Sequence, residues 1–397
     1  MTKLYFDCRD LLRAVRLGWS GKKMGFSFLG LIVAYLGYAI LTYGALLAAG
    51  ERFGAIWGTY GLYPSVCGSG VPWYSWVIHI VGILFALVVL FVCATAVAKI
   101  THRQLKGDDF YSMGDARKYG KKNWKAAVLS PTAILGMIAF LVLCGILIGL
   151  LGKIPYVGEL GFALGLPFIF VVALFTVFLG VVFVVSLVLT PAIVGITGED
   201  TLETVIQLFS TIWSQPWRLV LYEALLKIYI VIATVLLGIF SMKAASLIHW
   251  ACGLAMGEKM DSITQVAAGL LPTKCPVAAS FVAGTPVEVG GTLLVSGWIV
   301  GIMGVLLIFF VLSYGMSICS AGQTIIYLIL RQKKDSENLL EKKDQEEEEE
   351  ERKREDEERK QKAEDETKKA SASGESEDST EVEEAPEETS GSESEDE

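Results

Sequence analysis

The chain has 397 residues, of which 53% are hydrophobic, and its mean hydropathy is +0.50. Several uncharged apolar runs are as long as the roughly 20 residues that a helix needs to cross a bilayer. This composition excludes a secreted disulfide scaffold, a nucleic-acid-binding domain and an ordinary soluble enzyme, and it is typical of a polytopic membrane protein. The net charge of −9 combines −16 from Arg331 onward with +7 in the preceding residues.

The first 23 residues are basic and precede the first apolar run. Their apolar and charged side chains alternate with helical spacing, which predicts that residues 1–23 form an amphipathic helix at the cytoplasmic membrane interface. Trp19, Lys22 and Lys23 stand directly before the apolar run, where aromatic and basic side chains anchor a helix at the headgroups. The length of that run argues against a cleavable signal peptide.

The next part of the chain, residues 24–330, predicts an all-α fold with six transmembrane helices. The expected spans are Met24–Ala49, Ser75–Ile100, Ala126–Leu151, a part of Leu160–Ile196, Leu219–Ile239 and a sixth helix that starts near Gly291. Two runs exceed the length of a span. We expect Leu160–Ile196 to begin outside the bilayer core, because Gly161, Gly165 and Pro167 break a helix start. We expect the sixth to leave the bilayer where Ser317, Ser320, Gln323 and Thr324 appear, or to kink near Gly315 or Gly322.

Lysine and arginine gather on one side of these spans. Six lie in residues 1–23 and eight in residues 99–125, whereas the loops on the other side are poor in both. By the positive-inside rule, both termini are cytoplasmic, and the protein is expected in a bacterial inner membrane. The basic residues would meet anionic lipid there.

The cytoplasmic segments 101–125 and 198–217 resemble the N-terminus. They end in the anchor pairs Trp124–Lys125 and Trp217–Arg218, and apolar residues after Asp200 share one helical face. One interpretation is a threefold repeat of an interfacial amphipathic helix followed by a transmembrane hairpin. The other is that each basic loop simply carries the usual membrane anchors.

The largest outer loop is predicted over residues 241–290. It contains Cys252 and Cys275, and Cys67 lies in the first outer loop. One disulfide among these three cysteines is expected if the outer face is oxidising, and three free thiols are the alternative.

No nucleotide-binding loop, nucleophile elbow or metal-binding motif is present in the sequence. We therefore predict no catalytic residue, no cofactor site and no metal site, and we expect that the protein is not an enzyme. Glu223 and Lys227, four residues apart in the fifth span, are placed to form an intramembrane ion pair. Such a pair could lock the bundle, or it could be a self-neutralised pair near the interface.

Beyond the spans, residues 331–370 alternate acidic and basic side chains, which predicts a charged single helix. Residues 371–397 are rich in serine and acids and are predicted to be an acidic disordered tail. The tail is either an arm for a basic protein partner or a solvated extension.

Three segments carry a resemblance to a known group of proteins: the start from Asp7 to Lys23, the Leu105–Phe110 loop and the Gln215–Arg218 segment. With a final Ile326–Arg331 run, they resemble an uncharacterised family of bacterial six-span integral membrane proteins. The resemblance covers residues 1–331 in patches and implies no established activity.

Three functional hypotheses follow from the sequence, of which a membrane enzyme has the least support because no catalytic cluster is present. The first is a non-enzymatic scaffold or assembly component with a cytoplasmic charged arm, which would bind membrane lipids and partners or form an oligomer. The alternative is a permease or channel component for a neutral or lipid-like solute. The scarcity of charge in the middle of the spans argues against ion coupling. No nucleic-acid partner is expected.

Overall fold

The computed structural model describes residues 4–66, 70–270, 290–336 and 338–341, together with Arg352 and Arg359 of the C-terminal extension. The chain divides into two compact units, Met1–Lys342 and Lys343–Glu397. The fold presented below is that of the first unit. Within its described residues, all regular secondary structure is helical.

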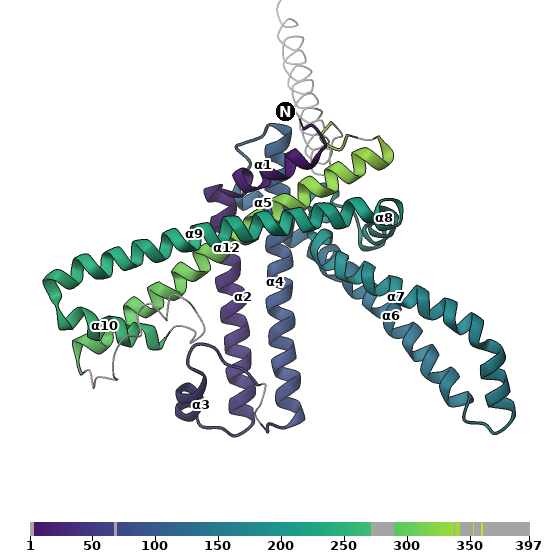
Figure 1. Cartoon of the computed structure of the whole chain (residues 1–397), viewed down its shortest axis with the longest axis horizontal. Helices are drawn as coiled ribbons and strands as arrows, with labels where there is room; N and C mark the ends of the chain where they lie inside the picture. The colour runs from purple at the N-terminus through teal and green to yellow at the C-terminus, as the bar shows by residue number, and fades with distance from the viewer. Residues whose placement is uncertain are drawn as a thin grey trace, which may run out of the picture. The chain divides into compact units, whose positions relative to one another are not determined.

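Six helices are long and apolar enough to cross a membrane, which confirms the predicted all-helical chain with six candidate spans. They are α2 (Gly21–Ala48), α4 (Trp73–Lys106), α6 (Trp124–Leu151), α7 (Val157–Thr197), α9 (Pro216–Met256) and α12 (Thr292–Asp335). The helices pair as three hairpins, α2 with α4, α6 with α7 and α9 with α12 (Figure 1). The two helices of each pair are antiparallel (Figure 1).

Short helices stand before and between the long ones. Three precede the hairpins: α1 (Cys8–Gly18), α5 (Met113–Lys122) and α8 (Thr201–Ser214). Two more lie in the connections, α3 (Phe53–Tyr60) between α2 and α4, and α10 (Glu258–Gly269) between α9 and α12. We call the end of the hairpins next to α1, α5 and α8 the basal end, and the opposite end the distal end.

Two helices extend beyond the ranges predicted for their spans. Helix α9 continues past Ile239 to Met256 and α10 follows it, so the first part of the predicted loop 241–290 is helical. The residues Lys243–Ala251 contain no proline or glycine that would stop the helix. In the fourth span, α7 starts at Val157 and accommodates Pro167 within the helix. Helices in membranes tolerate such residues when the freed backbone groups find other partners.

The last span is a single helix of 44 residues, which ends at Asp335. The expected separate charged helix over 331–370 therefore does not begin at Arg331, since that residue belongs to the last turns of α12. Ser336 adopts a positive φ of 53°, and the Leu340 amide donates to Asn338 Oδ1 over 3.2 Å. Leu340, shortly after the end of the helix, is buried in the hydrophobic core. Residues 342–397 lie outside the described residues, except that Arg352 and Arg359 are helical.

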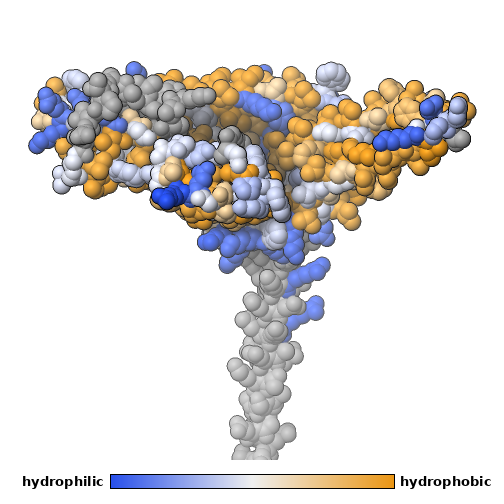
Figure 2. Space-filling model, turned by 90° about the horizontal axis from the view of Figure 1, so that it is seen from below, coloured by the Kyte–Doolittle hydropathy of each residue, from blue (hydrophilic) through white to orange (hydrophobic). Residues whose placement is uncertain are grey.

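The main hydrophobic core lies at the basal end and centres on α12. That helix contacts α1, α2, α4, α7, α8 and α9, and each of its residues from Ser320 to Leu330 is buried. Toward the distal end the hairpins expose large apolar side chains, such as Leu164 (84%) and Phe168 (72%) on α7 and Leu254 (74%) on α9. Figure 2 shows hydrophobic residues over much of the visible surface.

Candidate functional site: the basal core around α12

A polar stripe runs along the buried part of α12. Ser313, Ser317, Thr324 and Tyr327 follow one another at spacings close to helical turns, and all four are buried. In the sequence, the serines and the threonine indicate that the helix leaves the bilayer, which stays a prediction. In the structure they lie inside the protein, because other helices surround this part of α12. Periodic polar residues on a long apolar helix are the sequence signal for this core.

Helix α1 lies directly against this stripe. The Ser317 hydroxyl donates to the Gly18 carbonyl over 2.9 Å, and the rings of Trp19 and Tyr314 meet edge to face with centroids 5.0 Å apart. A β-carbon at Gly18 would lie 2.6 Å from Ile318 Cγ1, so only glycine permits this approach. The contacts fix the N-terminal helix to the last span, about 300 residues later in the chain.

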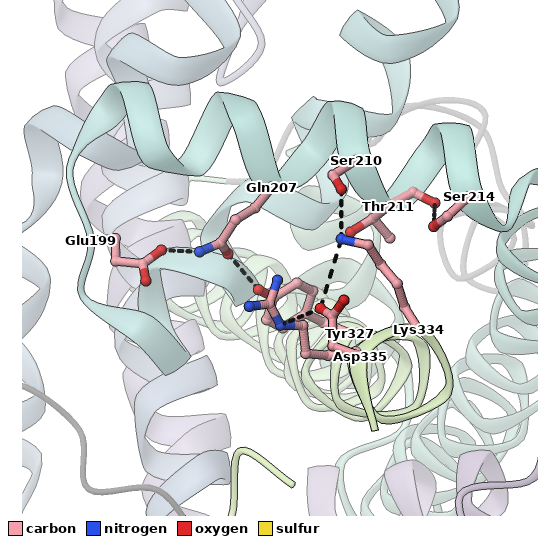
Figure 3. A network of polar contacts seen from close by, with 9 residues as sticks. Glu199, Gln207, Ser210, Thr211, Ser214, Tyr327, Lys334 and Asp335 are labelled. Carbon is pink, nitrogen blue, oxygen red and sulfur yellow. Dashed lines mark hydrogen bonds and ion pairs between the residues drawn. The ribbon is translucent and has the colours of Figure 1, made fainter. Parts of the chain in front are cut away.

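Helix α8 holds the other side of α12 through a polar network (Figure 3). The Tyr327 hydroxyl donates to Gln207 Oε1 over 2.5 Å, and Gln207 Nε2 donates to the Glu199 carboxylate. Near the end of α12, Lys334 Nζ donates to the hydroxyl of Ser210, which lies one turn after Gln207 on α8, over 2.5 Å. Buried polar side chains that satisfy one another in this way specify one arrangement of the helices.

The end of α12 carries ion pairs outside the core. Lys333 Nζ lies 3.1 Å from Asp7 Oδ1, which joins α12 to the residue before α1. Asp335 Oδ2 lies 3.0 Å from Arg331 Nε and 3.7 Å from Lys334 Nζ. The last turn of α12, from which the charged extension continues, is therefore held by contacts to both α1 and α8.

The face of α8 that meets the core carries both polar and apolar side chains. Thr204, Gln207 and Thr211 are buried there beside Leu208 and Ile212. In a soluble protein the apolar stripe of a surface helix faces the core. Helix α8 also has exposed apolar side chains at the basal end, since Leu202 and Trp213 are 75% and 77% exposed.

Basic residues of α4 are buried in the basal end rather than displayed on it. Lys99 is fully buried, and its ammonium group lies 4.4 Å from the centroid of the Tyr119 ring of α5. The Tyr119 hydroxyl donates to the Val194 carbonyl of α7 over 2.7 Å. The guanidinium group of Arg103 lies 5.6 Å from the Tyr111 ring. These cation–π contacts tie α5 and its preceding loop to α4, and the hydroxyl ties α5 to α7.

The predicted interfacial anchors differ in exposure. Trp217 is 85% exposed, Trp19 58% and Trp124 39%. Lys22, Lys125 and Arg218 are also exposed. Lys23 is fully buried instead, and its ammonium group donates to the Leu17 carbonyl over 3.1 Å. This lysine therefore closes the turn between α1 and α2.

Glu223 lies in α9 near the basal core. Its carboxylate is hydrogen-bonded to the Gln323 side chain of α12 and is attracted electrostatically by Lys227. Gln323 is a partner that the sequence did not suggest, because it comes from a helix 100 residues away. A direct Glu223–Lys227 ion pair stays a prediction.

Of the three outer cysteines, Cys252 lies exposed in α9. Cys67 and Cys275 lie outside the described residues, and so does the predicted disulfide. Among the residues that the structure does describe, no group of three His, Cys, Asp or Glu side chains is placed to hold a metal ion.

Comparisons with known proteins give no relative from which a function could be transferred. No protein-family model, no curated protein and no solved structure matches the chain.

Proposed function

We propose that this protein is a non-enzymatic membrane scaffold in which the basal core holds three transmembrane hairpins for binding to other membrane components. The observation that carries the proposal is the contrast between the two ends of the second hairpin. On α6, the buried residues lie between Ala126 and Ile134. Further along the same helix, Phe140 and Leu151 are 65% and 64% exposed. Large apolar side chains in a bilayer are available to lipid and to partner helices.

The same contrast favours a scaffold over a self-contained permease. A solute path through a bundle needs walls from several helices along the depth of the membrane. In the described residues, the largest core, which unites all three hairpins, lies at the basal end. Toward the distal end, the first hairpin also meets α12 through the ring pairs Trp57–Trp298 and Tyr35–Phe309. Close packing of α12 with its neighbours at the basal end would give the hairpins fixed bases and leave their distal parts free to bind.

We propose further that the basal end faces the cytoplasm of a bacterial cell, at its inner membrane. The lysine and arginine residues of segments 1–23 and 99–125 support this orientation. It would place both termini in the cytoplasm and bring exposed residues such as Lys22 and Lys125 close to anionic lipid.

The threefold repeat is part of this proposal. The chain order supports it, because α1, α5 and α8 each come directly before one hairpin. The uncovered apolar side chains Leu202, Ile206 and Trp213 support a membrane-interface position for α8. We also propose that the chain is related to the uncharacterised family of bacterial six-span membrane proteins that its sequence resembles.

The acidic extension would then serve as an arm for a basic protein partner. Its attachment to α12 supports this role, since Lys333 and Lys334 hold the end of that helix to Asp7 and Ser210. An arm that is covalently joined to the scaffold would have a raised effective concentration for a partner bound to the same protein.

Purification of the tagged full-length protein into native nanodiscs, without detergent, tests the function. We expect a stoichiometric protein partner, or copies of this chain, that remains after washing in high salt. Flux of a neutral solute in proteoliposomes that contain only the purified chain, in the absence of a stoichiometric partner, would contradict the scaffold and favour the permease.

A further inference from the structure

A pocket of about 330 Å³ lies between α4, α7 and α12. Nine of its twelve lining residues are apolar, and the other three are Cys319, Ser320 and Gln323 of α12. Leu87 and Leu187 line it with 36% and 37% of their surface exposed, whereas Gln323 is only 2% exposed. The pocket therefore runs from an apolar mouth at the protein surface to a buried polar floor.

Gln323 leaves a hydrogen-bond acceptor without a partner at this floor. Its Oε1 atom is buried and has no hydrogen-bond partner in the structure. A carboxylate accepts hydrogen bonds, so the carboxylate of Glu223 is bonded to the side-chain amide nitrogen of Gln323. The amide nitrogen of Gln323 therefore has a partner, whereas its amide oxygen has none. An unpaired buried acceptor is costly, so a donor that reaches it would be bound favourably.

A second hydrogen-bond acceptor, the carbonyl oxygen of Leu187, comes from α7. Pro191 lies inside α7, and because proline has no N–H it cannot donate the usual helical hydrogen bond to the Leu187 carbonyl. Both Pro191 and Leu187 line the pocket. The wall and the floor therefore both favour a ligand that brings a hydrogen-bond donor.

The lining also indicates the charge and size of the ligand. None of the twelve lining residues is ionisable at neutral pH, and a charged headgroup would lose its hydration without gaining an ion pair. The volume is near the lower limit of about 300 to 1,000 Å³ for ligand pockets, which suits one hydrocarbon chain better than a whole phospholipid. The polar residues are nearer the basal end and the apolar Leu87 and Met316 nearer the distal end, so a headgroup would point toward the basal end.

We propose that this pocket binds an uncharged, single-chain amphiphile through a hydroxyl group that donates a hydrogen bond to Gln323. The site is independent of the scaffold proposal, because it needs only α4, α7 and α12 and no partner on the distal hairpin faces. It would allow the basal core to respond to the neutral lipid content of the membrane.

The test uses the full-length protein in nanodiscs of phosphatidylcholine and phosphatidylglycerol. The probe is a sixteen-carbon alcohol that carries a photoreactive diazirine in its chain and a terminal alkyne. Mass spectrometry locates the labelled peptides, and unlabelled hexadecanol competes with the probe. We expect saturable labelling of peptides from α4, α7 or α12 at the pocket. Labelling spread over all lipid-facing helices would overturn the proposal.

Two comparisons separate the hydrogen bond from simple apolar burial. Hexadecyl methyl ether has nearly the same chain but no hydroxyl donor, and we expect it to compete about tenfold more weakly than hexadecanol. Gln323→Leu should weaken competition by the alcohol about tenfold and leave the ether unchanged. Equal competition by alcohol and ether in the native protein would overturn the hydroxyl assignment.

A filling variant tests the location even if Gln323→Leu fails to fold. Ala94→Phe places an aromatic ring at a lining position of α4, and Ala86→Phe makes the same change two turns earlier, outside the lining. We expect Ala94→Phe to reduce labelling at least tenfold and Ala86→Phe to retain it, with both proteins monodisperse. Retained labelling in a folded Ala94→Phe variant would overturn the site.

Discussion

The hydroxyl of Tyr327 on α12 donates a hydrogen bond to Oε1 of Gln207 on α8 over 2.5 Å, and both side chains are almost fully buried. This contact joins residues that are 120 positions apart in the sequence. It links the last transmembrane helix to the short helix before the third hairpin. The proposed scaffold depends on a rigid basal core, and this hydrogen bond is one of the contacts that would make the core rigid.

Tyr327→Phe removes the hydroxyl and keeps the ring. The Gln207 carbonyl oxygen then loses its donor in a buried environment, so we expect the free energy of unfolding to fall by about 1–3 kcal/mol. Reversible unfolding in mixed micelles measures the change. Tyr229→Phe on α9 is the matched control and should stay within about 0.5 kcal/mol, as expected away from buried polar networks. Equal effects of both variants would show that the Tyr327–Gln207 bond does not stabilise the core.

A second prediction concerns the close approach of α7 to α4. A β-carbon at Gly195 would lie 2.7 Å from Ala98 Cβ and 2.9 Å from the Thr95 carbonyl oxygen. The backbone atom cannot move aside easily, so Gly195→Ala should cost about 1–3 kcal/mol of unfolding free energy. Gly180 on the same helix has open space around it, and Gly180→Ala should be neutral or slightly stabilising. An equally neutral Gly195→Ala would mean that the two helices are not in this contact.

The ion pair between Lys333 and Asp7 should contribute much less than the buried contacts. The Asp7 side chain is 64% exposed, so solvent and salt screen the attraction. We expect Asp7→Asn to change the free energy of unfolding by less than about 1 kcal/mol, and this difference should disappear at high salt. A larger loss that persists at high salt would indicate that the pair is shielded from water and holds α1 more firmly than its exposure implies.

The sequence predicted the number of long helices because hydrophobic length is a strong and local signal. The sequence did not predict which residues of other helices pack against each long helix. Ser317 and Thr324 are buried because α1 and other helices cover them, and the spacing of polar residues along α12 did not point to those neighbours. The Glu223–Gln323 contact was missed for the same reason, since nothing in the spacing along α9 points to a partner on α12.

Helix ends were the other source of error. The extension of α9 to Met256 was missed because apolar content falls after Ile239, although the residues there still favour a helix. The sequence also did not reveal that Lys23 and Lys99 are buried. Basic residues beside a span usually anchor at the headgroups, and these two instead meet a carbonyl and an aromatic ring inside the protein.

The orientation of the membrane part can be tested with cysteines at the two ends of the second hairpin. In a background without native cysteines, Lys122→Cys marks the basal end and Lys153→Cys the distal end, and both positions are exposed. A membrane-impermeant maleimide added to intact spheroplasts should label Lys153→Cys and not Lys122→Cys, because basic loops remain in the cytoplasm. Both should react after lysis. Labelling of Lys122→Cys alone in intact spheroplasts would reverse the orientation.

Site-specific photocrosslinking on α7 tests the scaffold most directly. Benzoylphenylalanine replaces Phe168, which is 72% exposed toward the distal end, or Leu189, which is fully buried in the basal core. In living cells we predict that position 168 crosslinks to one discrete protein partner, or to a second copy of this chain, and that position 189 crosslinks to neither. Crosslinks from position 168 to lipid alone, with no protein adduct, would contradict the account.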